Sequence, residues 1–70
     1  MDEKTTRLMK LIEHWADHNS EHGQRYNETA DEAEELGLKD VSQEMKEAYS
    51  KSLEVSEHLR NALNILKESQ

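Results

Sequence analysis

The chain has 70 residues, of which 33% are hydrophobic, and it contains no Phe, Pro or Cys and only two Gly. A chain of this length forms at most one small domain, and without cysteine it has neither a disulfide nor a thiolate metal ligand. Sixteen acidic residues against nine basic ones give a net charge of -7, which argues against nucleic acid and anionic membranes as partners.

Apolar residues recur at helical spacing from about Thr5, which predicts a first helix over residues 5–36. Side chains three or four residues apart share a helix face, so we expect one contact seam, the line of side chains that faces another helix. The predicted seam of this helix comprises Leu8, Ile12, Trp15, Asn19, His22, Tyr26, Ala30 and Ala33. Gly23 either breaks the helix, with Asn27 capping a new one, or marks a close approach of another backbone.

The segment over residues 37–40 predicts a helix stop followed by a helix start. Gly37 suits the left-handed position after a helix, with Leu38 packing back on Ala33. Asp40 is the expected N-cap of the next helix, and Gln43 completes the capping pattern. A connection this short makes the two helices antiparallel neighbours.

The same spacing predicts a second helix over residues 41–67. Its predicted seam comprises Val41, Met45, Ala48, Ser52, Val55, Leu59, Ala62 and Leu66. Further apolar side chains flank both seams, so the apolar arcs are wider than a lone hairpin can bury. We therefore expect an all-α, antiparallel two-helix hairpin, a single domain over residues 1–70, which dimerises into a four-helix bundle. A partner chain that supplies the missing helices is the alternative.

Three of the four histidines, His14, His18 and His22, lie four residues apart, which places them on consecutive turns of the first helix. Counting outward from the turn, His58 lies level with His18, and Glu54 lies level with His22. The rotation of about 100° per residue predicts that all four histidines converge on one edge of the hairpin.

Neutral imidazole binds divalent transition ions, and Zn, Ni and Co are the expected metals. The candidate ligands are His14, His18, His22, His58 and Glu54. Asp17, Asn19 and Glu57 are candidates to orient the rings. Metal binding is expected to weaken in acid, because the proton competes for the same nitrogen. Histidines bonded to carboxylates in a polar seam without metal, and simply solvated histidines, are the alternatives.

The run His14-Trp15-Ala16-Asp17-His18-Asn19-Ser20-Glu21-His22 resembles a His-Trp-x-x-His-Asn-x-x-His pattern in small, uncharacterised prokaryotic helical proteins. In those proteins a Gly-centred turn and a second acidic helix follow, as Gly37 and residues 41–67 do here. The resemblance covers most of the chain. It implies a bacterial or archaeal source and a shared use of the three histidines, and it implies no particular activity. Four-helix di-iron proteins do not match, because they need Glu-x-x-His pairs, which this sequence lacks.

The sequence therefore favours a small divalent transition-metal-binding protein, with storage, delivery, sensing and structural roles left open. A metal-free helical interaction or adaptor module is the alternative. We do not expect an enzyme, because so thin a fold offers no obvious pocket. The N-terminus lacks a basic and apolar leader and no apolar run reaches membrane-spanning length, so we expect a cytoplasmic location and no membrane partner.

Overall fold

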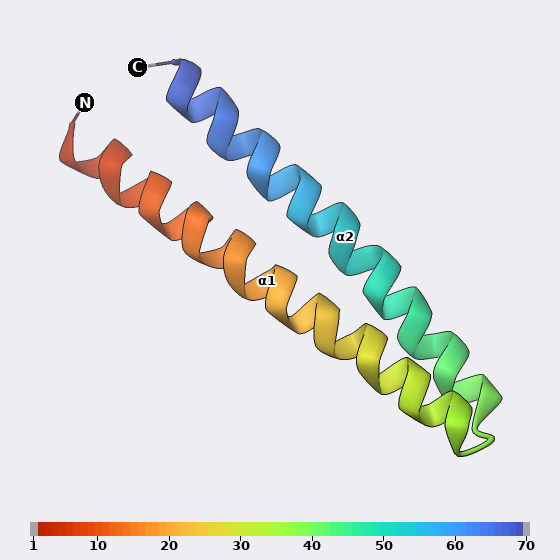
Figure 1. Ribbon diagram of the computed structural model, residues 1–70. Coiled ribbons are helices and arrows are strands. Elements are labelled where there is room, and N and C mark those ends of the chain that lie inside the picture. Colours follow the sequence, from red (N-terminus) through yellow and green to blue (C-terminus); the bar gives the residue numbers. More distant parts are fainter. Residues whose placement is uncertain (1, 70) are drawn as a thin grey trace.

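The computed structural model describes residues 2–69 as two long helices lying side by side. Helices α1 (Glu3–Glu35) and α2 (Lys39–Glu68) run antiparallel (Figure 1). Both termini lie at one end of the rod, the open end, and the turn lies at the other, the turn end (Figure 1). The described part of the chain contains no strand, and its Cα atoms span 53 × 14 × 11 Å. The predicted all-helical hairpin is confirmed.

Helix α1 begins at Glu3, slightly before the predicted start, because Asp2 caps it. The Asp2 carboxylate accepts a hydrogen bond from the Thr5 backbone N–H at 2.7 Å, as N-cap residues do for an otherwise unpaired donor of the first turn. Hydrogen bonds from the Thr5 backbone and side chain lower the pKa of Asp2, because they stabilise its ionised form.

The end of α1 has the predicted glycine cap. Gly37 adopts a φ of 77°, in the left-handed region that favours glycine. The Leu38 N–H donates to the Ala33 carbonyl at 2.9 Å, and the Gly37 N–H donates to the Glu34 carbonyl at 3.0 Å. This is the paired hydrogen-bond pattern of a Schellman motif, and it satisfies carbonyls that the helix end leaves open.

The predicted cap of α2 is wrong. Helix α2 starts at Lys39, so Leu38 occupies the N-cap position and no side chain caps it. The Leu38 carbonyl already accepts from the Ser42 N–H at 2.9 Å, so the chain passes from one helix into the next without a separate capping residue. Asp40 lies in the first turn instead, where a carboxylate interacts favourably with the helix dipole.

The observed seam differs from the predicted one at about every second position, where the residue that faces the other helix is the one directly after the predicted residue. On α1 it comprises Met9, Ile12, Ala16, Asn19, Gly23, Tyr26, Ala30 and Ala33. On α2 it comprises Ser42, Met45, Tyr49, Ser52, Ser56, Leu59, Leu63 and Leu66. The seam predictions for Leu8, Trp15 and His22 on α1 and for Val41, Val55 and Ala62 on α2 are therefore wrong, since all six side chains are exposed.

Small side chains occur near the middle of the seam, where the helices approach closely. A Cβ atom added to Gly23 would overlap the Ser52 Oγ and lie 3.3 Å from the Ser52 Cβ. Gly23 is buried inside an unbroken α1, so the predicted helix continues through it and the alternative of a break there is excluded. The predicted close approach is confirmed. Close approach through small residues brings backbones into contact but leaves little room for large apolar side chains.

The hydrophobic core is accordingly thin. The buried apolar residues are Ala16, Ala30, Ala33 and Leu63. Larger apolar side chains stay exposed, among them Trp15 at 50%, Val55 at 47% and Ile65 at 64%. Neither helix of residues 2–69 has the length and apolar character needed to cross a bilayer.

Candidate functional site

One side of the hairpin, the ion-pair face, contains polar contacts between the helices. Lys46 Nζ on α2 donates to Asn27 Oδ1 and to Asp31 Oδ1 on α1, both at 2.8 Å. Asn27 and Lys46 each directly follow a seam residue in the sequence. On both helices, the residues that directly follow a seam residue therefore lie on this side. These pairs are half exposed or more, and each adds little to stability.

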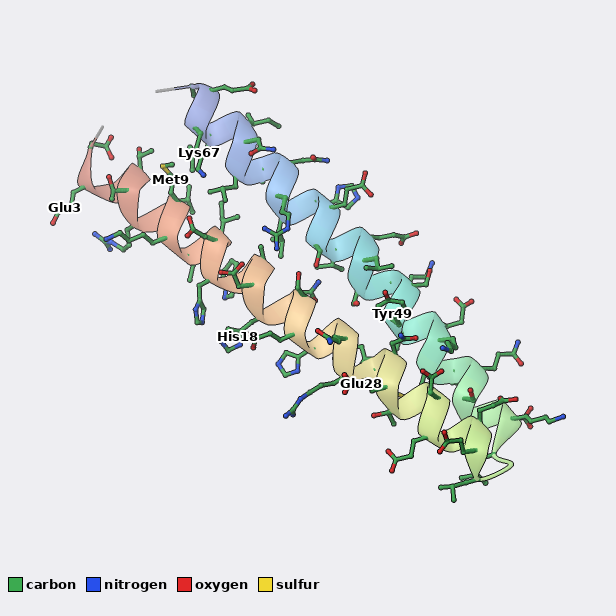
Figure 2. All side chains as sticks on the ribbon, viewed as in Figure 1. Glu3, Met9, His18, Glu28, Tyr49 and Lys67 are labelled. Carbon is green, nitrogen blue, oxygen red and sulfur yellow. The ribbon has the colours of Figure 1, made fainter. Side chains whose placement is uncertain are left out.

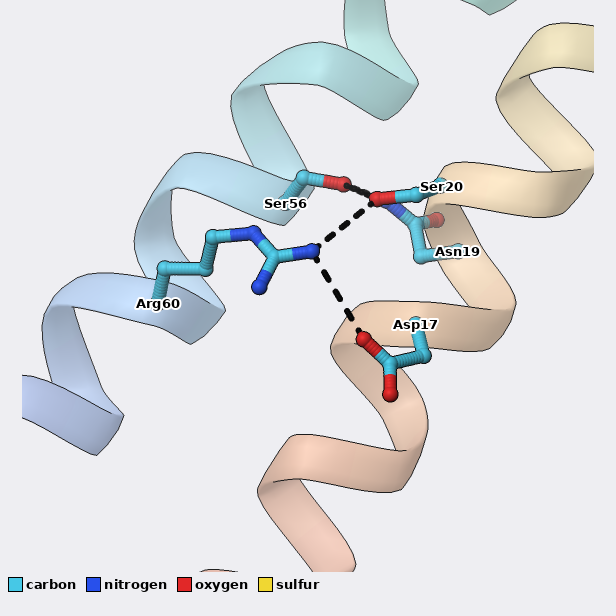
Figure 3. Close-up of polar contacts among 5 residues, drawn as sticks. All are labelled: Asp17, Asn19, Ser20, Ser56 and Arg60. Atoms are coloured by element: carbon cyan, nitrogen blue, oxygen red, sulfur yellow. Dashed lines mark hydrogen bonds and ion pairs between the residues drawn. The ribbon is translucent and has the colours of Figure 1, made fainter.

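The same face continues at the middle of the rod (Figure 3). Arg60 Nη2 lies 3.7 Å from Asp17 Oδ1 and 3.4 Å from Ser20 Oγ, and Ser20 Oγ lies 3.3 Å from Ser56 Oγ. Asn19 Nδ2 donates to Ser56 Oγ at 2.8 Å (Figure 3). Asp17 and Asn19 were expected to orient imidazoles, and that expectation is wrong, because both side chains contact α2 instead.

The opposite side of the hairpin, the histidine face, presents the residues that precede the seam. On α1 it comprises Lys4, Leu8, Leu11, Trp15, His18, His22, Arg25, Thr29 and Glu32, and on α2 it comprises Val41, Glu44, Ala48, Lys51, Val55, His58, Ala62 and Ile65. In an antiparallel pair these positions of both helices lie on one side, and the contacts of the ion-pair face fix the other side. The histidine face is apolar at the open end, has imidazoles near its middle and is charged at the turn end.

Acidic residues are scarce on this face. Of the sixteen acidic residues, only Glu32 and Glu44 lie on it, and both are near the turn end. Lys4, Arg25 and Lys51 more than balance them. The histidine face is therefore close to neutral in a molecule that carries a net charge of -7.

The three histidines of α1 form a continuous stack. The ring centroids of His14 and His18 are 4.3 Å apart, and those of His18 and His22 are 6.2 Å apart. The His22 ring then stacks on Tyr26 at 6.4 Å. All three histidines are exposed, and His18 points away from α2 (Figure 2). His14 lies two residues from both Ile12 and Ala16, which places it on the back of α1, outside the histidine face.

The two candidate ligands on α2 are not brought to the stack within one chain. His58 belongs to the histidine face but follows the seam residue Ser56 by two positions, which places it at the outer margin of α2. Glu54 lies two residues from both Ser52 and Ser56, so it projects from the back of α2, 3.8 Å from Lys51 Nζ. Within one chain His18, His22 and His58 therefore lie on the same side of the hairpin, whereas His14 and Glu54 lie on the backs of their helices.

A single chain offers an ion two adjacent imidazoles at a time. Over residues 2–69 no group of three or more His, Asp or Glu side chains is placed to hold a metal ion. At a tetrahedral angle, two Zn–N bonds of about 2.0–2.1 Å place the centres of the two rings roughly 5 Å apart. The His18–His22 separation of 6.2 Å is longer than this, so a change of side-chain rotamer would have to bring the two exposed rings together on one ion.

Sequence reasoning placed Asn19 and Ser52 in the seam and named Gly23 as a close approach, but it missed Ala16 and Ser56, which help to set the rotation of this site. Asn19 donates to the Ser52 carbonyl at 2.7 Å, and Gly23 lies against Ser52 one turn further on. The repeat of small residues at Ala16, Gly23 and Ala30, each seven apart, was the signal that could have located the seam.

Comparisons with known proteins find similarity over most of the chain. Residues 8–66 match the model of a domain of unknown function, DUF8180. An uncharacterised protein of Archaeoglobus fulgidus is 33% identical over 60 residues, which cover 86% of this chain and 95% of the relative. No solved structure matches the chain. The match spans both helices and the turn between them, and the chain belongs to the DUF8180 family.

Proposed function

We propose that the protein binds a divalent transition metal, Zn, Ni or Co, through His18 and His22. The observation that carries this proposal is the exposed pair of imidazoles on consecutive turns, with ring centroids 6.2 Å apart. Neutral imidazole prefers these metals, and exposure lets an ion reach the ring nitrogens. His14 extends the stack at 4.3 Å and serves as an auxiliary ligand.

The direct test is metal binding by protein purified without a histidine tag. We expect saturable binding of Zn²⁺, Ni²⁺ or Co²⁺ at neutral pH, measured by calorimetry and by elemental analysis of the isolated protein. The double variant His18→Ala/His22→Ala should lose it. The comparison variant is His14→Ala, which removes the auxiliary imidazole, also exposed, from the back of α1 and should weaken binding far less than the double variant does. Equal affinities in the wild type and the double variant would refute the proposal.

We further propose that the hairpin pairs with a second copy to form a four-helix bundle. Its thin core leaves Leu8 at 49%, Leu11 at 41% and Trp15 at 50% exposed on the histidine face. A chain of this size buries too little surface to be comfortably stable alone, and a second copy would cover these side chains. Sedimentation equilibrium of the wild type should give a dimer mass, and Trp15→Glu should shift it toward the monomer.

A metal-free interaction module is the second candidate function, favoured by the same exposed apolar side chains. In that case the histidines only contribute polar surface, and the partner is a different protein. A monomeric wild type that binds no metal, and whose melting temperature does not respond to a chelator, would favour this candidate over metal binding. A shared use of the histidines across the family is part of our proposal, and aligning relatives over residues 14–22 tests it.

A further inference from the structure

The geometry of one hairpin leaves the proposed metal site incomplete. His18 and His22 occupy the α1 side of the histidine face, whereas His58 occupies the outer margin on α2. Both His18 and His58 lie at the position two residues after a seam residue, roughly 130° from the seam direction by the helical rotation. Within one chain they therefore point toward opposite edges, although they lie at nearly the same height.

The height follows from the contacts across the seam. Gly23 lies against Ser52, and Ser20 lies against Ser56, so the numbers of level residues add up to about 75–76. His58 is therefore level with His18 to within about one residue, or ~1.5 Å along the axis. An assembly that keeps residues at the same height along the rod and brings opposite edges of two copies together would place these imidazoles side by side.

A second copy docked on the histidine face achieves this. Rotation by 180° about an axis along the rod places α1 against α2 of the partner, still antiparallel and at unchanged heights. The outer margins of α1 and of the partner's α2 then meet on the same edge. We infer that two copies pair through their histidine faces with open ends together, and that His18 and His22 of one copy share a metal ion with His58 of the partner.

Charge identifies the partner as a second copy of this chain. Two molecules of net charge -7 repel each other wherever their acidic surfaces meet. The histidine face, with Glu32 and Glu44 as its carboxylates, is the surface on which such a copy approaches against the least repulsion. Its extent of 53 by 14 Å is also comparable to the ~800 Å² per partner that stable interfaces bury.

The apolar residues fix the direction of pairing. With open ends together, Leu11 of one copy lies level with the partner's Ile65, and Trp15 lies beside the partner's Ala62. The reverse arrangement would set this apolar end against the charged turn end. The parallel arrangement places Arg25 near the partner's Lys51, but both side chains are exposed and extend into water, so this repulsion is small.

The pairing creates two equivalent sites in each dimer, each with three imidazoles and an open position for water or another ligand. Three protein ligands plus an exchangeable position distinguish a reactive or transferable zinc ion from a closed structural one. The inference rests on the metal binding proposed above and deepens it, since it names the partner that completes the ligand set.

Complementation between variants tests the shared site. The variants His18→Ala/His22→Ala and His58→Ala each lack part of every site, and both changes are at exposed positions, so folding should persist by circular dichroism. Co²⁺ binding is measured for each variant alone and after the two are mixed, unfolded and refolded together. In a mixed dimer, one site regains all three imidazoles and the other has none. Random pairing should restore about a quarter of the wild-type number of tight sites.

Each outcome separates the inference from the proposal beneath it. Restoration on mixing supports a site shared between copies, because a site within one chain cannot be rebuilt this way. Wild-type affinity in His58→Ala, or no restoration on mixing, overturns the shared site while metal binding stands. A wild type that binds no Co²⁺ refutes the proposed function itself.

A second measurement reports the direction of pairing without metal. The chain has no cysteine, so the variant Leu11→Cys/Ile65→Cys carries two thiols at opposite margins of one face. Mild oxidation should give a covalent dimer if the open ends lie together. The matched control Leu11→Cys/Arg25→Cys should crosslink instead if the hairpins run in opposite directions, and that result overturns the inference.

Discussion

Replacing Gly23 by Ala tests the close approach of the two helices. The added Cβ would overlap the Ser52 Oγ, which is held by a hydrogen bond of 2.9 Å to the Tyr49 carbonyl. It would also lie 3.3 Å from the Ser52 Cβ, which cannot rotate away. The helices must therefore separate by a few tenths of an ångström or more, at the point where Asn19 donates to the Ser52 carbonyl at 2.7 Å.

Two opposing effects set the magnitude. Overpacking of a tight contact costs typically 1–3 kcal/mol, and weakening a buried hydrogen bond costs about 1 kcal/mol more. The gain in helix propensity from Gly to Ala is about 1 kcal/mol in the other direction. We expect a net loss of about 1–3 kcal/mol, which corresponds to a fall of roughly 4–24 °C in melting temperature for a domain of this size.

The assay is thermal unfolding followed by circular dichroism at one fixed protein concentration, because pairing makes the melting temperature depend on concentration. The control is the same change in a Ser52→Ala background. Removing the Oγ relieves the worst overlap, so Gly23→Ala should cost less there, by about 1 kcal/mol. A higher melting temperature for Gly23→Ala than for the wild type would mean that propensity acts alone and that the helices do not touch at this residue.

Three further changes probe the fold by other routes. Asn19→Ala should destabilise the hairpin by about 1–3 kcal/mol in urea unfolding, because it removes the donor of two part-buried hydrogen bonds to α2, and an unchanged midpoint would contradict this. Gly37→Ala should cost about 1 kcal/mol with nothing nearby to clash, since φ is 77° there, whereas Gly37→Asn should cost less. Asp2→Ala should lower the melting temperature at pH 7. Because the pKa of Asp2 is lowered in the folded state, its stabilisation is present above the ordinary carboxylate pKa and lost as the pH falls through the lowered value, so the wild type and the variant should converge in strong acid.

The sequence was sufficient for the architecture because each signal for it is local. Helical spacing is unbroken before and after Gly37, which adopts the left-handed conformation that ends a helix. A connection this short makes the two helices antiparallel neighbours. The Asp40 cap failed because α2 begins at Lys39, two residues before the predicted start, so Leu38 takes the N-cap position and Asp40 lies in the first turn.

The seam was the harder inference, because two neighbouring residues compete for it at every second turn. Following the apolar spacing put Trp15 in place of Ala16 and Val55 in place of Ser56, but it also put Ala62 in place of Leu63. Residue size alone therefore does not decide between the two neighbours. At the middle of this hairpin the closest line of contact has small residues, and Trp15 and Val55 face the side that a second copy is proposed to cover.

The error displaced the metal ligands by the same rotation. With His22 placed in the seam, all four histidines are expected on one edge of the hairpin. With Gly23 in the seam instead, the imidazoles face outward, and the sequence of one chain does not indicate which molecule covers an outward face.

The tight contact of Gly23 with Ser52 also has a mechanical consequence. It lies near mid-length of the rod and holds the two helices together there. We therefore expect the separation between the helices to vary more toward the open end. His22 is the adjacent residue, and His18 is little more than one turn away. The imidazoles are thus anchored where the rod moves least, and their spacing should survive fraying of the ends.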